Sequence, residues 1–146
     1  MRIRSDVERK RLFGLASGEN SGGSIYTEDA TEKTYSRLEE LAETALACGW
    51  SVIVDAAFLR CAQRNRFRSL AARMNAPFFI LACEAPRKEL CRRLRERRND
   101  ASEATAAVLD EQMKWVEPLT EEERGLVISL EQSCGSCYRG RHENEV

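Results

Sequence analysis

The sequence predicts an α/β fold in which a parallel sheet carries helices on both of its faces. Three continuous apolar runs, at residues 51–55, 77–83 and 126–130, are typical of strands that are buried on both faces. Segments in which apolar residues recur every three or four positions alternate with these runs and predict helices. This alternation favours parallel βα units over an antiparallel sheet.

Length and composition indicate one globular domain. The chain has 146 residues, of which 42% are hydrophobic and 32% charged, so wholesale disorder is excluded. We expect residues 1–131 to form the domain and residues 132–146 a flexible tail. The sequence contains no membrane-spanning run, and from its first residues we expect neither a secretory signal nor an extracellular location, but a cytoplasmic protein. A net charge of −1 excludes a globally basic nucleic-acid binder.

The N-terminal third predicts a strand, a helix, a loop, a helix and a second strand. Residues 2–4 end a short strand that runs into a helix extending from Ser5 to about Leu15, and the glycine-rich residues 18–24 form a loop. Asp29 and Glu32 have the spacing of a capping box, and they begin a helix that Gly49 ends. The strand at 51–55 follows.

The remaining elements continue the alternation. A helix is expected over residues 61–75, the strand over 77–83, and a helix from Pro86 to about Arg98. Asp100 or Ser102 caps the next helix, which reaches about Trp115. Thr120 opens a short acidic helix before the last strand at 126–130. Because ligands bind beyond the carboxyl ends of parallel strands, we expect Asp6, Asp55 and the residues after Cys83 along one edge.

Three sequence patterns carry chemistry. Asp6 and Arg9 form a D-x-x-R motif at a helix start, and Asp55 ends an apolar strand. Pro86, Leu90, Arg93 and Arg97 form a P-x-x-x-L-x-x-R-x-x-x-R pattern, which places both arginines on one helix face. In this order the patterns resemble the P-loop kinases of the polynucleotide-kinase and zeta-toxin type. The resemblance spans residues 3–130 and is strongest to the ATP-binding domain of bacterial aminoglycoside-phosphotransferase-like fusion proteins.

The resemblance implies an ATP-dependent phosphotransferase with a P-loop NTPase-like three-layer sandwich. Asp6 would be the general base for a small-molecule or nucleotide hydroxyl, and Arg9 would bind the substrate. Asp55 would lie near Mg²⁺, in contact through water. Arg93 and Arg97 would clamp the transferred phosphoryl group, a role that arginines can fill with a large effect on rate. We also expect Arg60, at the start of a basic block, to bind substrate.

One part of the family pattern is missing from the sequence. The family begins with an apolar strand and a G-x-x-x-x-G-K-[ST] loop that cradles phosphates, and these 146 residues contain no such loop. In the family's sheet this strand is the central one, between the strands at 51–55 and 77–83. An upstream segment could supply it, the sheet could close across the gap, or a partner chain could supply it. We favour the first alternative.

Each candidate residue also has a purely structural reading. Asp6 could cap its helix, Asp55 could satisfy a strand end, and Arg93 and Arg97 could pair with the acidic residues that follow them. Ala57 departs from the family, which often has a polar residue after the strand-end aspartate.

A different class of function is a non-catalytic domain that binds a phosphorylated ligand or, less readily, RNA. Residues 60–98 contain twelve Lys and Arg against three acids, and guanidinium groups match phosphate oxygens. In the tail, Cys134 and Cys137 form a C-x-x-C pair. With His142 this pair is one ligand short of a structural zinc site, so we expect a polar tail, with zinc binding or redox chemistry as minor alternatives.

Overall fold

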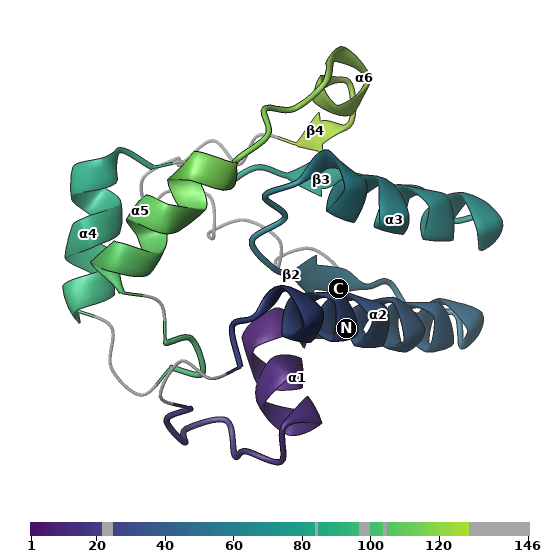
Figure 1. Cartoon of the computed structure of the whole chain (residues 1–146). Helices are drawn as coiled ribbons and strands as arrows, with labels where there is room; N and C mark the ends of the chain where they lie inside the picture. Colours follow the sequence, from purple (N-terminus) through teal and green to yellow (C-terminus); the bar gives the residue numbers. More distant parts are fainter. Residues whose placement is uncertain (22–24, 84, 97–99, 104, 129–146) are drawn as a thin grey trace, which may run out of the picture.

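The computed structural model describes residues 1–21, 25–83, 85–96, 100–103 and 105–128 (Figure 1). The predicted tail, Arg97 and the Cys134–Cys137 pair lie outside the described residues. The elements in chain order are β1 (Arg2–Arg4), α1 (Ser5–Leu12), α2 (Glu28–Ala47), β2 (Ile53–Asp55), α3 (Cys61–Arg73), β3 (Ile80–Leu81), α4 (Arg87–Glu96), α5 (Ala106–Trp115), α6 (Glu121–Arg124) and β4 (Val127–Ile128). Among the described residues, no helix is long and apolar enough to cross a bilayer.

The described strands form two separate parallel sheets. β1 pairs with β2, with Ile3 opposite Val54, and β3 pairs with β4, with Ile80 opposite Val127. In the described part of the chain β2 and β3 are not hydrogen-bonded to each other. The parallel α/β class is therefore confirmed. The alternative in which the sheet closes directly across the gap is wrong for these residues.

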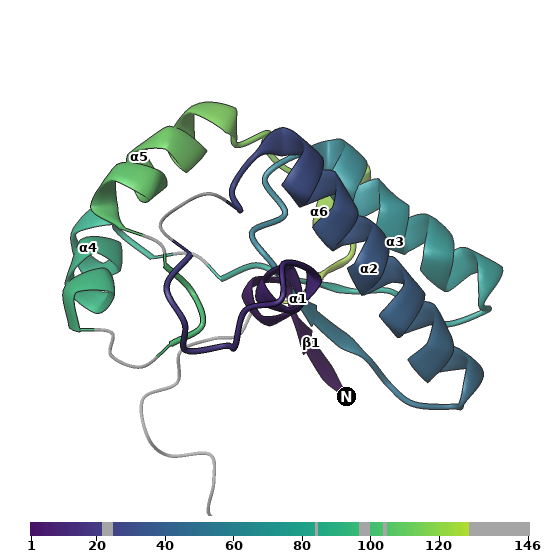
Figure 2. The same ribbon diagram turned by 60° about the horizontal axis from the view of Figure 1, so that its bottom comes forward.

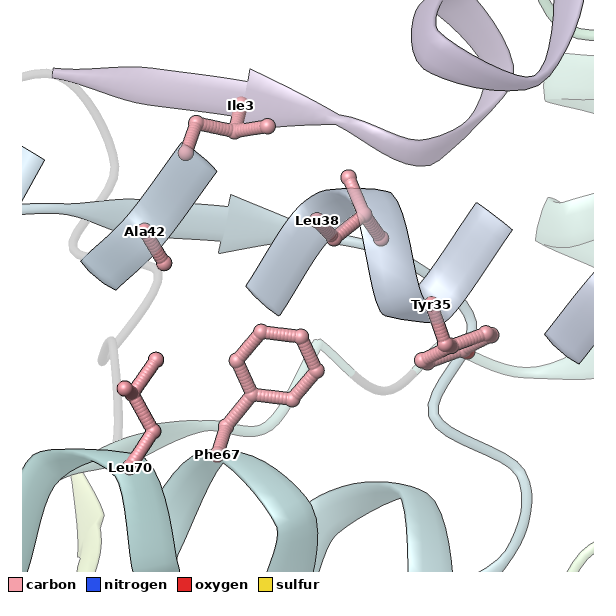
Figure 3. Close-up of a cluster of buried hydrophobic side chains, with 6 residues drawn as sticks. All are labelled: Ile3, Tyr35, Leu38, Ala42, Phe67 and Leu70. Atoms are coloured by element: carbon pink, nitrogen blue, oxygen red, sulfur yellow. The ribbon is translucent and has the colours of Figure 1, made fainter. Parts of the chain in front are cut away.

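The core lies between the strands and the helices α2 and α3. Ile3 of β1 and Leu38 of α2 are buried, and they belong to one cluster with Phe67 and Leu70 of α3 (Figure 3). The ring of Tyr35 meets those of Phe58 and Phe67 edge-on, with centroids 5.6 and 6.4 Å apart. Such edge-to-face pairs add to the free energy gained from burial.

The expectation of strands buried on both faces is wrong. β2 and β3 are shorter than the apolar runs that predicted them, and alternate side chains face solvent: Ile53 is 60% exposed and Phe79 61%. Val54 and Phe78, on the opposite face, pack against the core. Successive strand side chains point to opposite faces, so the helices of the described part cover one face of these strands. The expected three-layer sandwich stays a prediction.

Two predicted helix starts are also corrected. Thr27 caps α2, because its side chain accepts a hydrogen bond from the backbone N–H of Ala30 at 3.1 Å. The side chain of Thr105 caps α5 in the same way. The predicted capping residues at these two helices are therefore wrong, because a threonine hydroxyl nearer the helix start is the acceptor in each case.

Arg64 fixes α6 and the segment before it against α3. Its Nε and Nη2 donate to the two carboxylate oxygens of Glu123 at 2.7 and 3.0 Å. The remaining donors reach the carbonyl oxygens of Phe58, Glu117 and Pro118 at 3.0–3.3 Å. Arg64 and Glu123 are both buried. All five donors of this guanidinium are thus used, which satisfies a buried charge.

Candidate functional site

The carboxyl end of β2 and the starts of α1, α2 and α3 open onto a cleft of about 1340 Å³, whose other wall is made by α4 and α5. Both views place α4 and α5 to one side of α2 and α3 (Figures 1 and 2). The cleft brings together the described candidates of the sequence, which are Asp6, Arg9, Asp55, Arg60 and Arg93. Arg97 lies outside the described residues.

Asp6 is the second residue of α1 and lies at the cleft wall. The N-cap position belongs to Arg4, and α1 has no side-chain cap. Asp6 therefore does not cap the helix, which removes that structural explanation. Within the described part of the chain its carboxylate forms no hydrogen bond or ion pair, although the side chain is only half-exposed. The carboxylate is thus available to a ligand in the cleft.

Arg9 follows one turn later and is 7% exposed. Its Nη1 donates to the carbonyl of Ile25 at 3.1 Å and to Thr31 Oγ1 at 3.4 Å, and its guanidinium lies 5.2 Å from the ring centre of Tyr26. Burial lowers the pKa of Arg9, because removal from water disfavours the charged form. Its Nε is buried without a partner in the described structure.

Asp55 is held by two arginines. Arg2 Nε donates to its Oδ2 at 3.1 Å, and Arg4 Nε lies 3.7 Å from the same oxygen. Mg²⁺ binds carboxylate oxygens together with several waters or phosphates, whereas this carboxylate is already neutralised. No group of three or more acidic, His or Cys side chains in the described part could hold a metal. The described residues therefore do not fit a magnesium site of their own.

Arg60 and Arg93 are both ion-paired. Arg60 Nη1 lies 3.2 Å from Glu28 Oε1, and its guanidinium lies 6.0 Å from the ring centre of Trp115. Arg93 Nε lies 2.7 Å from Glu89 Oε1, one turn earlier on α4. The expectation that Arg93 pairs with the acids that follow it is therefore wrong in the described structure.

Sequence reasoning missed a buried lysine beside the cleft. Nζ of Lys10, a residue 1% exposed, donates to the carbonyls of Ser17 and Glu19 at 3.1 and 2.6 Å and lies 3.0 Å from Glu103 Oε1. Glu103 also accepts two hydrogen bonds from Ser21, at 2.8 and 2.7 Å. This cluster ties the segment before α5 to α1. No sequence signal could have found it, because its members are ordinary polar residues that are distant along the chain.

The parallel βα units and the cleft at their carboxyl ends define a parallel α/β domain with a ligand-binding edge. Residues 1–119 match the family described as "AAA domain", a P-loop NTPase-like kinase family, and the chain belongs to this family. Proteins of this family generally use ATP and Mg²⁺. A comparison with curated proteins and one with solved structures found no match.

Proposed function

We propose that the chain carries the acceptor side of an ATP-dependent phosphotransferase. Its reaction would transfer a phosphoryl group to the hydroxyl of a small molecule or a nucleotide. The observation that carries this proposal is the carboxylate of Asp6, which lines the cleft and forms no hydrogen bond or ion pair within the described part of the chain. A carboxylate left unpaired in a cleft is a candidate general base, because nothing else there uses its lone pairs.

In this reaction Asp6 accepts the proton of the acceptor hydroxyl. The hydroxyl oxygen forms a bond to the γ-phosphorus of ATP, and the bond between that phosphorus and the β–γ bridging oxygen breaks, so that ADP leaves. Such transfers depend mainly on positioning and on neutralising charge. Arg93, on α4, could turn from Glu89 to the transferred group, because its ion pair is an exposed one and such pairs contribute little free energy.

In this proposal, residues outside these 146 supply the ATP-binding half. The sequence has no phosphate-cradling loop, and tight ATP binding by the chain alone is therefore not expected. β2 and β3 are unpaired with each other, and Ile53, Phe79 and Leu81 are exposed. Unpaired strand edges and exposed apolar faces favour the addition of a strand. An upstream segment is the source we favour, and a partner chain is the alternative.

The substitution Asp6→Asn tests the assignment in the chain once the missing segment is present. Loss of the general base should lower the rate of phosphoryl transfer by about 10²–10⁴-fold and leave ATP binding unchanged. Asp29→Asn is a matched control, because Asp29 also lies in the first turn of a helix but is exposed and outside the cleft. Turnover by Asp6→Asn equal to that of Asp29→Asn would reject Asp6 as the base.

The binding of RNA or a phosphorylated ligand through residues 60–98 is less well supported. Described arginines of this block pair with carboxylates: Arg60 with Glu28, Arg64 with Glu123, Arg66 with Glu32 and Glu39, Arg68 with Glu122, Arg73 with Glu39, Arg87 with Asp110, and Arg92 and Arg93 with Glu89. The block is therefore largely neutralised by acids from other elements. Nucleotide-independent RNA binding that weakens steeply with salt would favour this alternative instead.

A further inference from the structure

Two exposed aromatic side chains line the cleft and have no part in the reaction as described above. Tyr26 is 41% exposed and Trp115 59%. Each ring lies against an arginine, Arg9 for Tyr26 and Arg60 for Trp115. Aromatic rings that stay in water inside a cleft are well suited to pack against another ring, because this buries a large apolar area on both partners.

Both rings are connected to the start of α2. Arg60 contacts both the Trp115 ring and Glu28, the first residue of α2, and Tyr26 lies just before that helix. Arg9, which supports the Tyr26 ring, is itself fixed by the carbonyl of Ile25. The rings are therefore positioned before a ligand arrives, which lowers the entropy lost on binding.

Tyr26 also lies close to the proposed base. Burial raises the pKa of the Tyr26 hydroxyl, and the negative charge of Asp6 raises it further. The phenol therefore stays neutral at ordinary pH. A ring packed against Tyr26 would lie near Asp6, so that a hydroxyl on the same ligand could reach that carboxylate.

The charges of the cleft disfavour an anionic ligand. Its described lining includes six carboxylates and four arginines. Arg60, Arg66 and Arg93 are ion-paired, and Arg9 is buried.

Gln112 lines the cleft and forms no hydrogen bond within the described part of the chain. Its amide offers both donors and an acceptor to the edge of a planar ring.

We propose that the acceptor carries an uncharged planar aromatic ring, which packs against Tyr26 and Trp115 while its hydroxyl reaches Asp6. This inference rests on the proposed function and names the substrate class of that site. A nucleoside base and the ring of a non-nucleotide aromatic alcohol share this chemistry. Stacking on aromatic side chains accepts many ring types, so the two sources are separated by experiment.

Fluorescence of Trp115 provides the test. The sequence has two tryptophans, and Trp50 lies outside the cleft, so Trp50→Phe leaves Trp115 as the only reporter. This full-length chain is titrated with the four ribonucleosides, with AMP, with benzyl alcohol and with glucose. We expect saturable quenching by the nucleosides or by benzyl alcohol, weaker quenching by AMP than by adenosine, and none by glucose.

Variants at Tyr26 separate stacking from loss of structure. Tyr26→Ala should weaken affinity at least about 5-fold, the lower end of the effect of a lost base–aromatic stack, and Tyr26→Phe should retain it. Phe13→Ala is the matched control, because Phe13 is 43% exposed but lies outside the cleft, and it should bind like the parent.

The inference is overturned by an absence of quenching with every aromatic ligand, by AMP binding more tightly than adenosine, or by unchanged affinity in Tyr26→Ala. These titrations need no phosphoryl transfer, so they can fail or succeed independently of the Asp6→Asn test.

Discussion

At the scale of single residues, burial separates arginines that look alike in the sequence. Arg64 is buried and uses all five of its donors, whereas Arg9 is buried and forms hydrogen bonds through Nη1. Arg92 and Arg93 form exposed ion pairs with Glu89. The sequence pattern proposed Arg9 and Arg93 as functional residues, but it carried no information on burial, and Arg64 matched no motif.

The Arg64–Glu123 pair should make a large contribution to stability. Glu123→Ala leaves the Arg64 charge buried and uncompensated, and we expect the free energy of unfolding to fall by about 3–5 kcal/mol. The control Glu122→Ala breaks the exposed pair with Arg68 and should cost less than about 1 kcal/mol. Urea unfolding of both variants checks this. An equal decrease in the free energy of unfolding in the two variants would contradict the claim that burial makes the Arg64–Glu123 pair important.

The same pair gives stability a defined pH dependence. The hydrogen bonds from Arg64 lower the pKa of Glu123 from 4.5 to about 2. A carboxyl group with a lower pKa in the folded state binds fewer protons there than in the unfolded state, so its stabilisation is complete above about pH 4.5 and is lost as the pH falls towards 2. In Glu123→Gln, the free energy of unfolding should fall less steeply between about pH 4.5 and 2. In Glu122→Gln, it should fall as steeply as in the parent.

At the scale of elements, α2 and α4 differ in the contacts that stabilise them. α2 buries residues over most of its length, including Leu38 and Ala42, whereas α4 has no buried residue in the described structure. α4 is held by exposed ion pairs, such as the one between Arg87 and Asp110. A ten-residue helix without packing is marginal in water. α4 is thus held more weakly than α2.

Hydrogen exchange should report this difference. We expect the backbone amides of α4 to exchange at least about tenfold faster than those of α2, because local opening of α4 exposes little apolar surface. Added salt should increase exchange in α4 further, since it screens the exposed pairs. Equal protection of the two helices, unaffected by salt, would show that α4 is packed more firmly than its burial indicates.

Element type and order were largely predictable, and element ends were not. Apolar periodicity identified the helix that became α2, but the hydroxyl of Thr27 caps it. Apolar runs marked the strands, yet β3 is confined to Ile80 and Leu81. Strand length depends on a hydrogen-bonded neighbour, and no local pattern shows whether that neighbour is present.

At the scale of the whole molecule, the described strands form two separate sheets, β1–β2 and β3–β4. The sequence predicted the residues that line the cleft better than it predicted the exposed surfaces. Asp6, Asp55 and Arg93, which the motifs singled out, all line one cleft, and the carboxyl end of β2 opens onto it. The sequence did not predict that Tyr26 and Trp115 line the cleft. Both residues lie in or beside loops, where no periodic pattern of apolar residues indicates which side chains come together. Ile53 and Phe79 are exposed because the described helices cover only the opposite face of these strands.

The intact mass of the native protein, measured with bound chains retained, tests the central claim most directly. The account predicts a mass above 16.6 kDa, either in one longer polypeptide or in a complex. The added residues should contain an apolar strand followed by a G-x-x-x-x-G-K-[ST] loop. A species of 16.6 kDa with no bound chain would contradict the account, because these residues alone would then lack the ATP-binding half that the proposed phosphotransferase requires.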